Sequence, residues 1–73
     1  MAIDLQSDFA EAHLVRGIVR TETRNYQWAL RDFSIAIDRD PSLARAYYQR
    51  GIVRATVGEH AMAIEDFSQT LER

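Results

Sequence analysis

Four arginines stand at matched positions in this sequence and are its first candidates for chemistry. They open and close two copies of the segment RGIVR and are Arg16, Arg20, Arg50 and Arg54. Arginines four residues apart share one face of a helix, so they predict either a basic stripe for phosphates, RNA or an acidic peptide, or cations held by internal carboxylates. Asp32 and Asp66 recur in the same phase as the arginines. We favour the second interpretation and expect ion pairs between Arg20 and Asp32 and between Arg54 and Asp66, so that alanine at either aspartate should destabilise the fold.

The remaining reactive side chains form no catalytic or metal-binding pattern. The chain has no cysteine, and all nine of its basic residues are arginines, so thiol and lysine chemistry are excluded. His13 and His60 lack the spacing of metal ligands, and no glycine-rich loop or activated nucleophile accompanies the scattered carboxylates. We therefore expect no enzymatic activity, no metal and no cofactor.

Length, charge and hydropathy narrow the class of protein further. A chain of 73 residues makes one domain at most, and its net charge of -2 does not favour a polyanion as partner. No run approaches the roughly 18 apolar residues that a membrane span needs. We expect a soluble, intracellular (cytoplasmic) protein with neither a membrane nor a nucleic acid as partner.

The elements that must position these side chains follow from an internal repeat. A shift of 34 residues aligns residues 10–39 with residues 44–73, and 12 of the 30 aligned pairs are identical. The same shift places residues 2–4 on residues 36–38. We therefore divide the chain into the end of an earlier unit with a turn (1–9), a first full unit (10–43) and a second unit truncated after its second helix (44–73), and expect a piece excised from a longer protein.

Each unit has the pattern of two helices joined by a short turn. Apolar residues recur at helical spacing over residues 44–57 and 61–71, and over 28–37 in the first unit. Asp40 and Pro41 predict a helix start, and Gly58 predicts a helix stop. Gly17 and Gly51 should let the paired helices approach closely. The sequence predicts an all-α fold of antiparallel helix hairpins stacked as an α-solenoid.

This 34-residue helix hairpin resembles the tetratricopeptide repeat (TPR) family. The residues that carry the resemblance are Tyr47, Gly51, Ala63 and Phe67 in one unit and Gly17, Tyr26, Ala29, Phe33, Ala36 and Pro41 in the other. The sequence departs from the family pattern at His13, Arg20, Ser7, Arg24 and Arg54. Arginine replaces an aromatic residue at Arg20 and Arg54, serine replaces the proline at Ser7, and Arg24 replaces the glycine between the helices.

The resemblance implies a protein interaction scaffold whose first helices line a concave groove for a partner peptide or helix. The groove positions of the family fall here on Glu11, Leu14, Ile18, Thr21, Arg45, Tyr48, Ile52 and Ala55. Four of them, Leu14, Ile18, Tyr48 and Ile52, would form an apolar strip that either accepts partner side chains or packs against neighbouring repeats. Tyrosine favours the first use because it gives a large contact area at low entropic cost.

Two further features point to contacts at the surface. Trp28 stands at a position that often faces outward in this family, where it either binds a partner or packs on the preceding helix. Met62, Ile64 and Leu71 on the last helix have no following helix to cover them, so we expect an apolar association face there. The sequence thus leaves a second function open, a structural repeat unit that oligomerises through its exposed ends.

Overall fold

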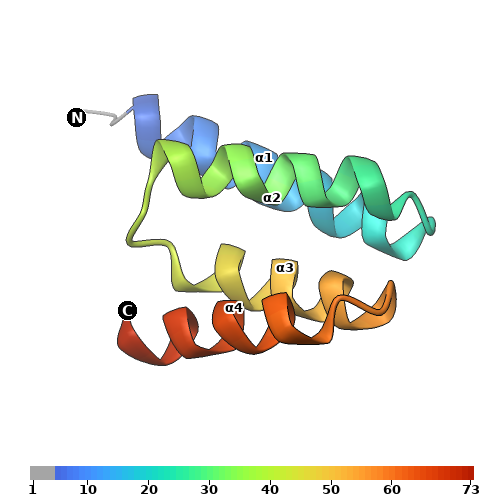
Figure 1. Ribbon diagram of the computed structural model, residues 1–73. Coiled ribbons are helices and arrows are strands. Elements are labelled where there is room, and N and C mark those ends of the chain that lie inside the picture. The colour runs from blue at the N-terminus through green and yellow to red at the C-terminus, as the bar shows by residue number, and fades with distance from the viewer. Residues whose placement is uncertain (1–4) are drawn as a thin grey trace.

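The computed structural model describes residues 5–73, which form four α-helices (Figure 1). They are α1 (Leu5–Glu22), α2 (Tyr26–Arg39), α3 (Ala44–Thr56) and α4 (His60–Glu72). No strand occurs in this range, so the predicted all-α fold class is confirmed.

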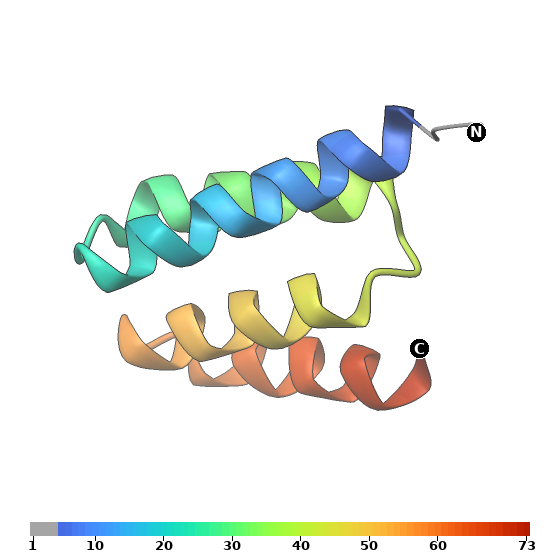
Figure 2. The same cartoon turned by 180° about the vertical axis from the view of Figure 1, so that it is seen from behind.

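The helices form two antiparallel hairpins, α1 with α2 and α3 with α4, which stack on each other (Figures 1 and 2). Figure 1 looks onto α2 and α4, and Figure 2 looks onto α1 and α3 from the opposite side. The second hairpin meets the first mainly through α3 and α2, while α4 packs on no described helix other than α3. The Cα atoms span only 14 Å along the shortest axis, so every helix keeps one face at the surface.

The start of α1 differs from the sequence-based division of the chain. Residues 1–9 were expected to hold the end of an earlier helix and a turn, but residues 5–9 form the start of α1, and residues 1–4 lie outside the described range. Ser7 stands where the next unit has Pro41. Proline lacks a backbone N–H and disfavours a helical residue before it, so Pro41 separates α2 from α3, whereas serine lets the helix continue.

The connection between the hairpins also differs in detail from the prediction. Asp40 was expected to cap α3, but α3 begins at Ala44 after Leu43. The carboxylate of Asp40 instead accepts hydrogen bonds from the backbone N–H and the hydroxyl of Ser42, at 3.1 and 2.6 Å. Aspartate therefore fixes the turn after α2, as short polar side chains commonly do.

Glycine allows the two helices of each hairpin to approach closely. A methyl group added at Gly17 would lie 2.5 Å from Cε1 of Phe33, and one at Gly51 would lie 2.7 Å from Cε1 of Phe67. Each phenylalanine ring thus rests on the backbone of the opposing helix. The ring of Phe33 belongs to the main apolar core, which comprises Leu14, Ala29, Phe33, Ala36, Ile37, Ala46, Tyr47 and Val53.

The turns inside the two hairpins have the same backbone shape but different residues at the critical position. Gly58 follows α3 with φ +91°, and its counterpart Arg24 follows α1 with φ +65°. The backbone N–H groups of Asn25 and Glu59 make equivalent hydrogen bonds of 2.7 Å to the carbonyls of Arg20 and Arg54. A residue with a Cβ is strained at positive φ, so the first turn is the less favourable one.

Replacing Arg24 by glycine is therefore expected to stabilise the protein. Relief of the left-handed strain should raise the free energy of unfolding by about 1 kcal/mol, measured by urea denaturation. The control is Arg31→Gly in the interior of α2, where glycine should lower it by about 1 kcal/mol. A loss of stability in Arg24→Gly would contradict the account of this turn.

Candidate functional site

The most polar feature of the first hairpin is a cluster around the buried carboxylate of Asp32 on α2. Arg16 donates from Nε to both carboxylate oxygens at 3.2 and 3.1 Å and from Nη2 to Oδ1 at 2.9 Å. Arg20 places Nη1 3.1 Å from Oδ2, and His13 places Nδ1 3.5 Å from Oδ1. Three side chains of α1 therefore converge on one carboxylate of α2.

The second hairpin repeats this arrangement around Asp66 on α4. Arg50 donates from Nε to Oδ2 at 3.1 Å and from Nη2 to Oδ1 at 2.9 Å, and Arg54 donates from Nη1 to Oδ2 at 3.0 Å. Arg50 also donates from Nη1 to the hydroxyl of Ser34 on α2, at 3.3 Å. The same arginine thus joins α3 to its own hairpin partner and to the preceding hairpin.

These contacts show that the four repeated arginines pair with internal carboxylates. The structure brings Arg20 to Asp32 and Arg54 to Asp66, the two pairs named from the sequence. Sequence reasoning missed the closer partners Arg16 and Arg50, although each stands 16 residues before its aspartate in both hairpins. Because guanidiniums held by carboxylates are already neutralised, this geometry does not favour a phosphate-binding stripe.

The environment of Asp32 controls its ionisation. Burial acts to raise the pKa of Asp32, but the hydrogen bond from Arg16, the charges of Arg16 and Arg20 and the contact with His13 outweigh burial and hold this pKa below its usual value. A carboxyl group whose pKa is lower in the folded chain than in the unfolded chain contributes stability above the unfolded pKa. That contribution is lost as the pH falls through the folded pKa.

Stability is therefore expected to fall on acidification below about pH 4, the ordinary range for an aspartate. Asp32→Asn should show a weaker dependence on pH in this acid range, because asparagine has no proton to gain. Urea midpoints measured between pH 7 and pH 2.5 test this expectation. Asp38→Asn, at an exposed site of the same helix, is the control, and identical pH profiles for Asp32→Asn and the unmodified protein would contradict it.

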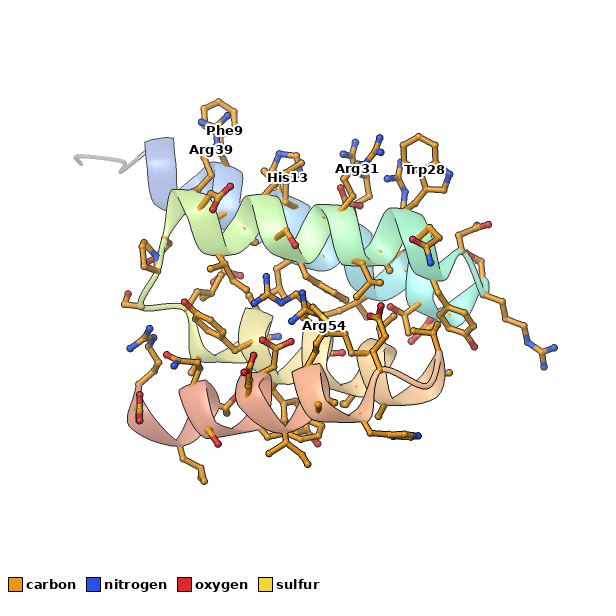
Figure 3. The ribbon with its side chains drawn as sticks, in the orientation of Figure 1. Phe9, His13, Trp28, Arg31, Arg39 and Arg54 are labelled. Atoms are coloured by element: carbon orange, nitrogen blue, oxygen red, sulfur yellow. The ribbon has the colours of Figure 1, made fainter. Side chains whose placement is uncertain are left out.

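Trp28 lies on the outer side of the first hairpin, away from α3 and α4 (Figure 3). Half of its side chain is exposed, and the guanidinium carbons of Arg20 and Arg31 lie 5.3 and 4.9 Å from its ring centroid. The hollow beside it is lined by α2 residues alone, so no second element closes it. Trp28 is thus covered by arginine side chains rather than by another helix.

The predicted groove positions do not all lie at the surface. Glu11, Arg45 and Tyr48 are exposed, and Ile18, Thr21, Ile52 and Ala55 are half-buried. The groove assignment does not hold for Leu14, whose side chain is fully buried in the core and follows the second use predicted for the strip, packing against a neighbouring hairpin. Its counterpart Tyr48 is exposed because no described helix packs beyond the second hairpin. The hydroxyl of Thr21 is also engaged, since it donates to the carbonyl of Gly17 at 2.8 Å.

What remains of the apolar strip belongs to α1 and α3, the two helices nearest the viewer in Figure 2. Tyr48 and Ile52 are one turn apart on α3, and Ile18 is the counterpart of Ile52 on α1. The ring of Tyr48 packs on that of Phe67 with 6.0 Å between centroids. Tyr48 is therefore supported from behind while its outer half meets the solvent.

The predicted association face is exposed along α4, where Met62, Ile64 and Leu71 all reach the surface. Over residues 5–73, no three histidine, cysteine, aspartate or glutamate side chains lie close enough to hold a metal ion. No helix in the same range has the length and apolarity to cross a membrane.

Comparison with known proteins adds no family to these observations. The sequence matches no protein-family model, and a search of curated proteins finds no match.

Proposed function

We propose that this chain is a protein-interaction module of the tetratricopeptide type rather than an enzyme, and that it binds a partner peptide or helix on the face of α1 and α3. The 34-residue repeat and the two stacked hairpins support this proposal. Tyr48 carries it, because a half-exposed tyrosine whose ring packs on Phe67 offers a partner a supported apolar surface together with a hydroxyl group. Ile52 extends the apolar surface along α3, and Ile18 adds an apolar side chain on α1.

The experiment is a selection of random peptides displayed on phage against the immobilised chain, followed by affinity measurements on the selected peptides. Tyr48→Ala should weaken their binding at least tenfold, the effect expected of a central aromatic anchor. The control is Trp28→Ala, which removes an aromatic side chain of similar exposure from another surface (Figure 3). Selected peptides that bind Tyr48→Ala as tightly as the unmodified chain would contradict the proposed groove.

A second candidate function is assembly through the ends of the repeat array. Apolar side chains on the outer surfaces of both hairpins favour it, namely Val15 and Val19 on α1 and Ile64 and Leu71 on α4. Large apolar surfaces in contact with water commonly mark sites of association.

A further inference from the structure

Because the two hairpins are copies of each other, their differences in exposure show which surfaces a neighbouring hairpin covers. Each of residues 10–39 has a counterpart 34 positions later, at the equivalent place in residues 44–73. The second hairpin packs on the first through α3, which lies mainly along α2 and also touches α1, whereas α4 contacts neither helix of the first hairpin. The far side of α1 and the far side of α4 therefore have no described neighbour. A residue that is buried in one hairpin and exposed in the other therefore lies on a surface made for hairpin-to-hairpin contact.

Residues that are buried on α3 and exposed at the equivalent positions of α1 identify one surface. Val53 of α3 is completely buried, whereas its counterpart Val19 of α1 is 52% exposed. Ala46 is likewise buried and Ala12 exposed. We call the surface of Ala12 and Val19 the head surface. The alanine and the valine at these positions of α3 are buried in the core that α3 shares with α2. The same two residue types on α1 face the solvent on the outer side of the first hairpin.

On α2 and α4 the comparison identifies the opposite surface. Ile37 of α2 is 9% exposed, whereas its counterpart Leu71 of α4 is 89% exposed. Leu30 packs against the core, whereas its counterpart Ile64 is 65% exposed. We call the surface of Ile64 and Leu71 the tail surface. Tyr48 of α3 borders it, because its counterpart Leu14 of α1 is buried in the core shared with the following hairpin. The head and tail surfaces thus repeat the two sides of the contact that already holds the hairpins together.

A polar contact supports the same matching. Arg50 donates a hydrogen bond to Ser34 across the hairpin boundary. The counterparts Arg16 and Ser68 have the same residue types, and both are exposed, Arg16 on the first hairpin and Ser68 on the second. Stacking of two copies in the register of the internal contact would bring Ser68 of one copy to Arg16 of the other.

We propose that the chain associates head to tail, with the tail surface of one copy packed on the head surface of a second copy in the register of the contact between α2 and α3. This inference rests on the assembly function proposed above and specifies its geometry. Because the two surfaces differ, each added copy leaves one head and one tail free, so the contact continues into an open chain of copies.

The register also says which exposed residue of α4 lies outside the contact. Met62 is the counterpart of Trp28, and Trp28 stays half exposed although a hairpin follows α2. The tail surface therefore excludes Met62, which belonged to the association face predicted from the sequence. This gives a matched control on the same helix as Ile64.

The experiment compares a head variant, Val19→Asp, with a tail variant, Ile64→Asp, by light scattering during size-exclusion chromatography. The mass of the unmodified chain should rise above 8.4 kDa with concentration. Each variant alone should remain at the monomer mass, because one of its two surfaces is damaged. An equimolar mixture should give a species of about twice 8.4 kDa, joined by the one intact pair of surfaces. Met62→Asp should assemble like the unmodified chain.

Other outcomes overturn the inference in distinguishable ways. A two-fold contact would let one of the two variants associate alone and give no new species on mixing, which would contradict the head-to-tail geometry but leave assembly standing. A monomer at every concentration would contradict assembly itself, while leaving peptide binding to be judged by the Tyr48→Ala variant. Circular dichroism checks that the variants fold, and Ala12→Glu replaces Val19→Asp if that variant does not.

Discussion

Replacing Asp66 by alanine is expected to lower the free energy of unfolding by about 3 kcal/mol, the lower end of the range for breaking a buried ion pair. The carboxylate is almost fully buried and accepts all the side-chain hydrogen bonds that join Arg50 and Arg54 to α4. Its removal leaves two largely buried guanidiniums without an anion. For a chain of this size, the corresponding fall in the thermal midpoint is about 15 °C.

The measurement is thermal and urea denaturation at a protein concentration low enough to give the monomer mass. Glu65→Ala removes a neighbouring exposed carboxylate from the same helix and should change stability little. Asp32→Ala should cost less than Asp66→Ala, because Arg16 is more exposed than Arg50 and can be solvated when its partner is lost. Equal stabilities for Asp66→Ala and Glu65→Ala would show that the cluster does not hold the second hairpin together.

The clusters have a consequence for the proposed function as an interaction module. Each places charged groups between two helices, where the geometry of a guanidinium and a carboxylate fixes how far one helix can slide along the other. Apolar contacts are less directional, since side chains of similar size can interdigitate in more than one register. Because the two helices of each hairpin are held in one register, the head surface, the tail surface and the side chain of Tyr48 keep one relative arrangement.

Much of the architecture could be predicted because it depends on local residue types. Gly58 predicts a turn that needs positive φ, and Gly17 predicts a close approach of two helices, so the structural role of each can be inferred from the sequence alone. The aspartates could be assigned to arginines because both recur with the period of the repeat. Which of two arginines donates more hydrogen bonds depends on side-chain rotamers, and the sequence does not encode these in a readable pattern.

The predictions of exposure and of helix bounds differ from the structure where the two units are not equivalent. Leu14 and Tyr48 occupy the same position of the repeat, yet one is in the core and the other is at the surface. Exposure depends on whether another hairpin lies alongside, which is a property of the array and not of the unit. The helical course of residues 5–9 is a second case, because Ser7 stands at the position of Pro41 and does not interrupt a helix as proline does.

Replacing Phe33 by alanine is expected to lower the free energy of unfolding by about 4 kcal/mol, through lost burial and an unfilled cavity in the core. Phe67 supplies an internal control, because it has the same role on Gly51 but is only half-buried. Phe67→Ala should therefore cost clearly less. Urea denaturation of the monomer measures both, and equal losses would contradict the difference in burial between the two hairpins.

A double-mutant cycle isolates the contact of the ring with the opposing helix. In the unmodified chain, Gly17→Ala should be destabilising by about 1 kcal/mol or more, because the new methyl group meets the ring of Phe33 and outweighs the better helix propensity of alanine. In the Phe33→Ala background the same methyl group enters empty space, so Gly17→Ala should become stabilising. Phe33→Leu serves as the background if Phe33→Ala does not fold. The same penalty in both backgrounds would mean that Gly17 is needed for something other than the close approach of α1 and α2.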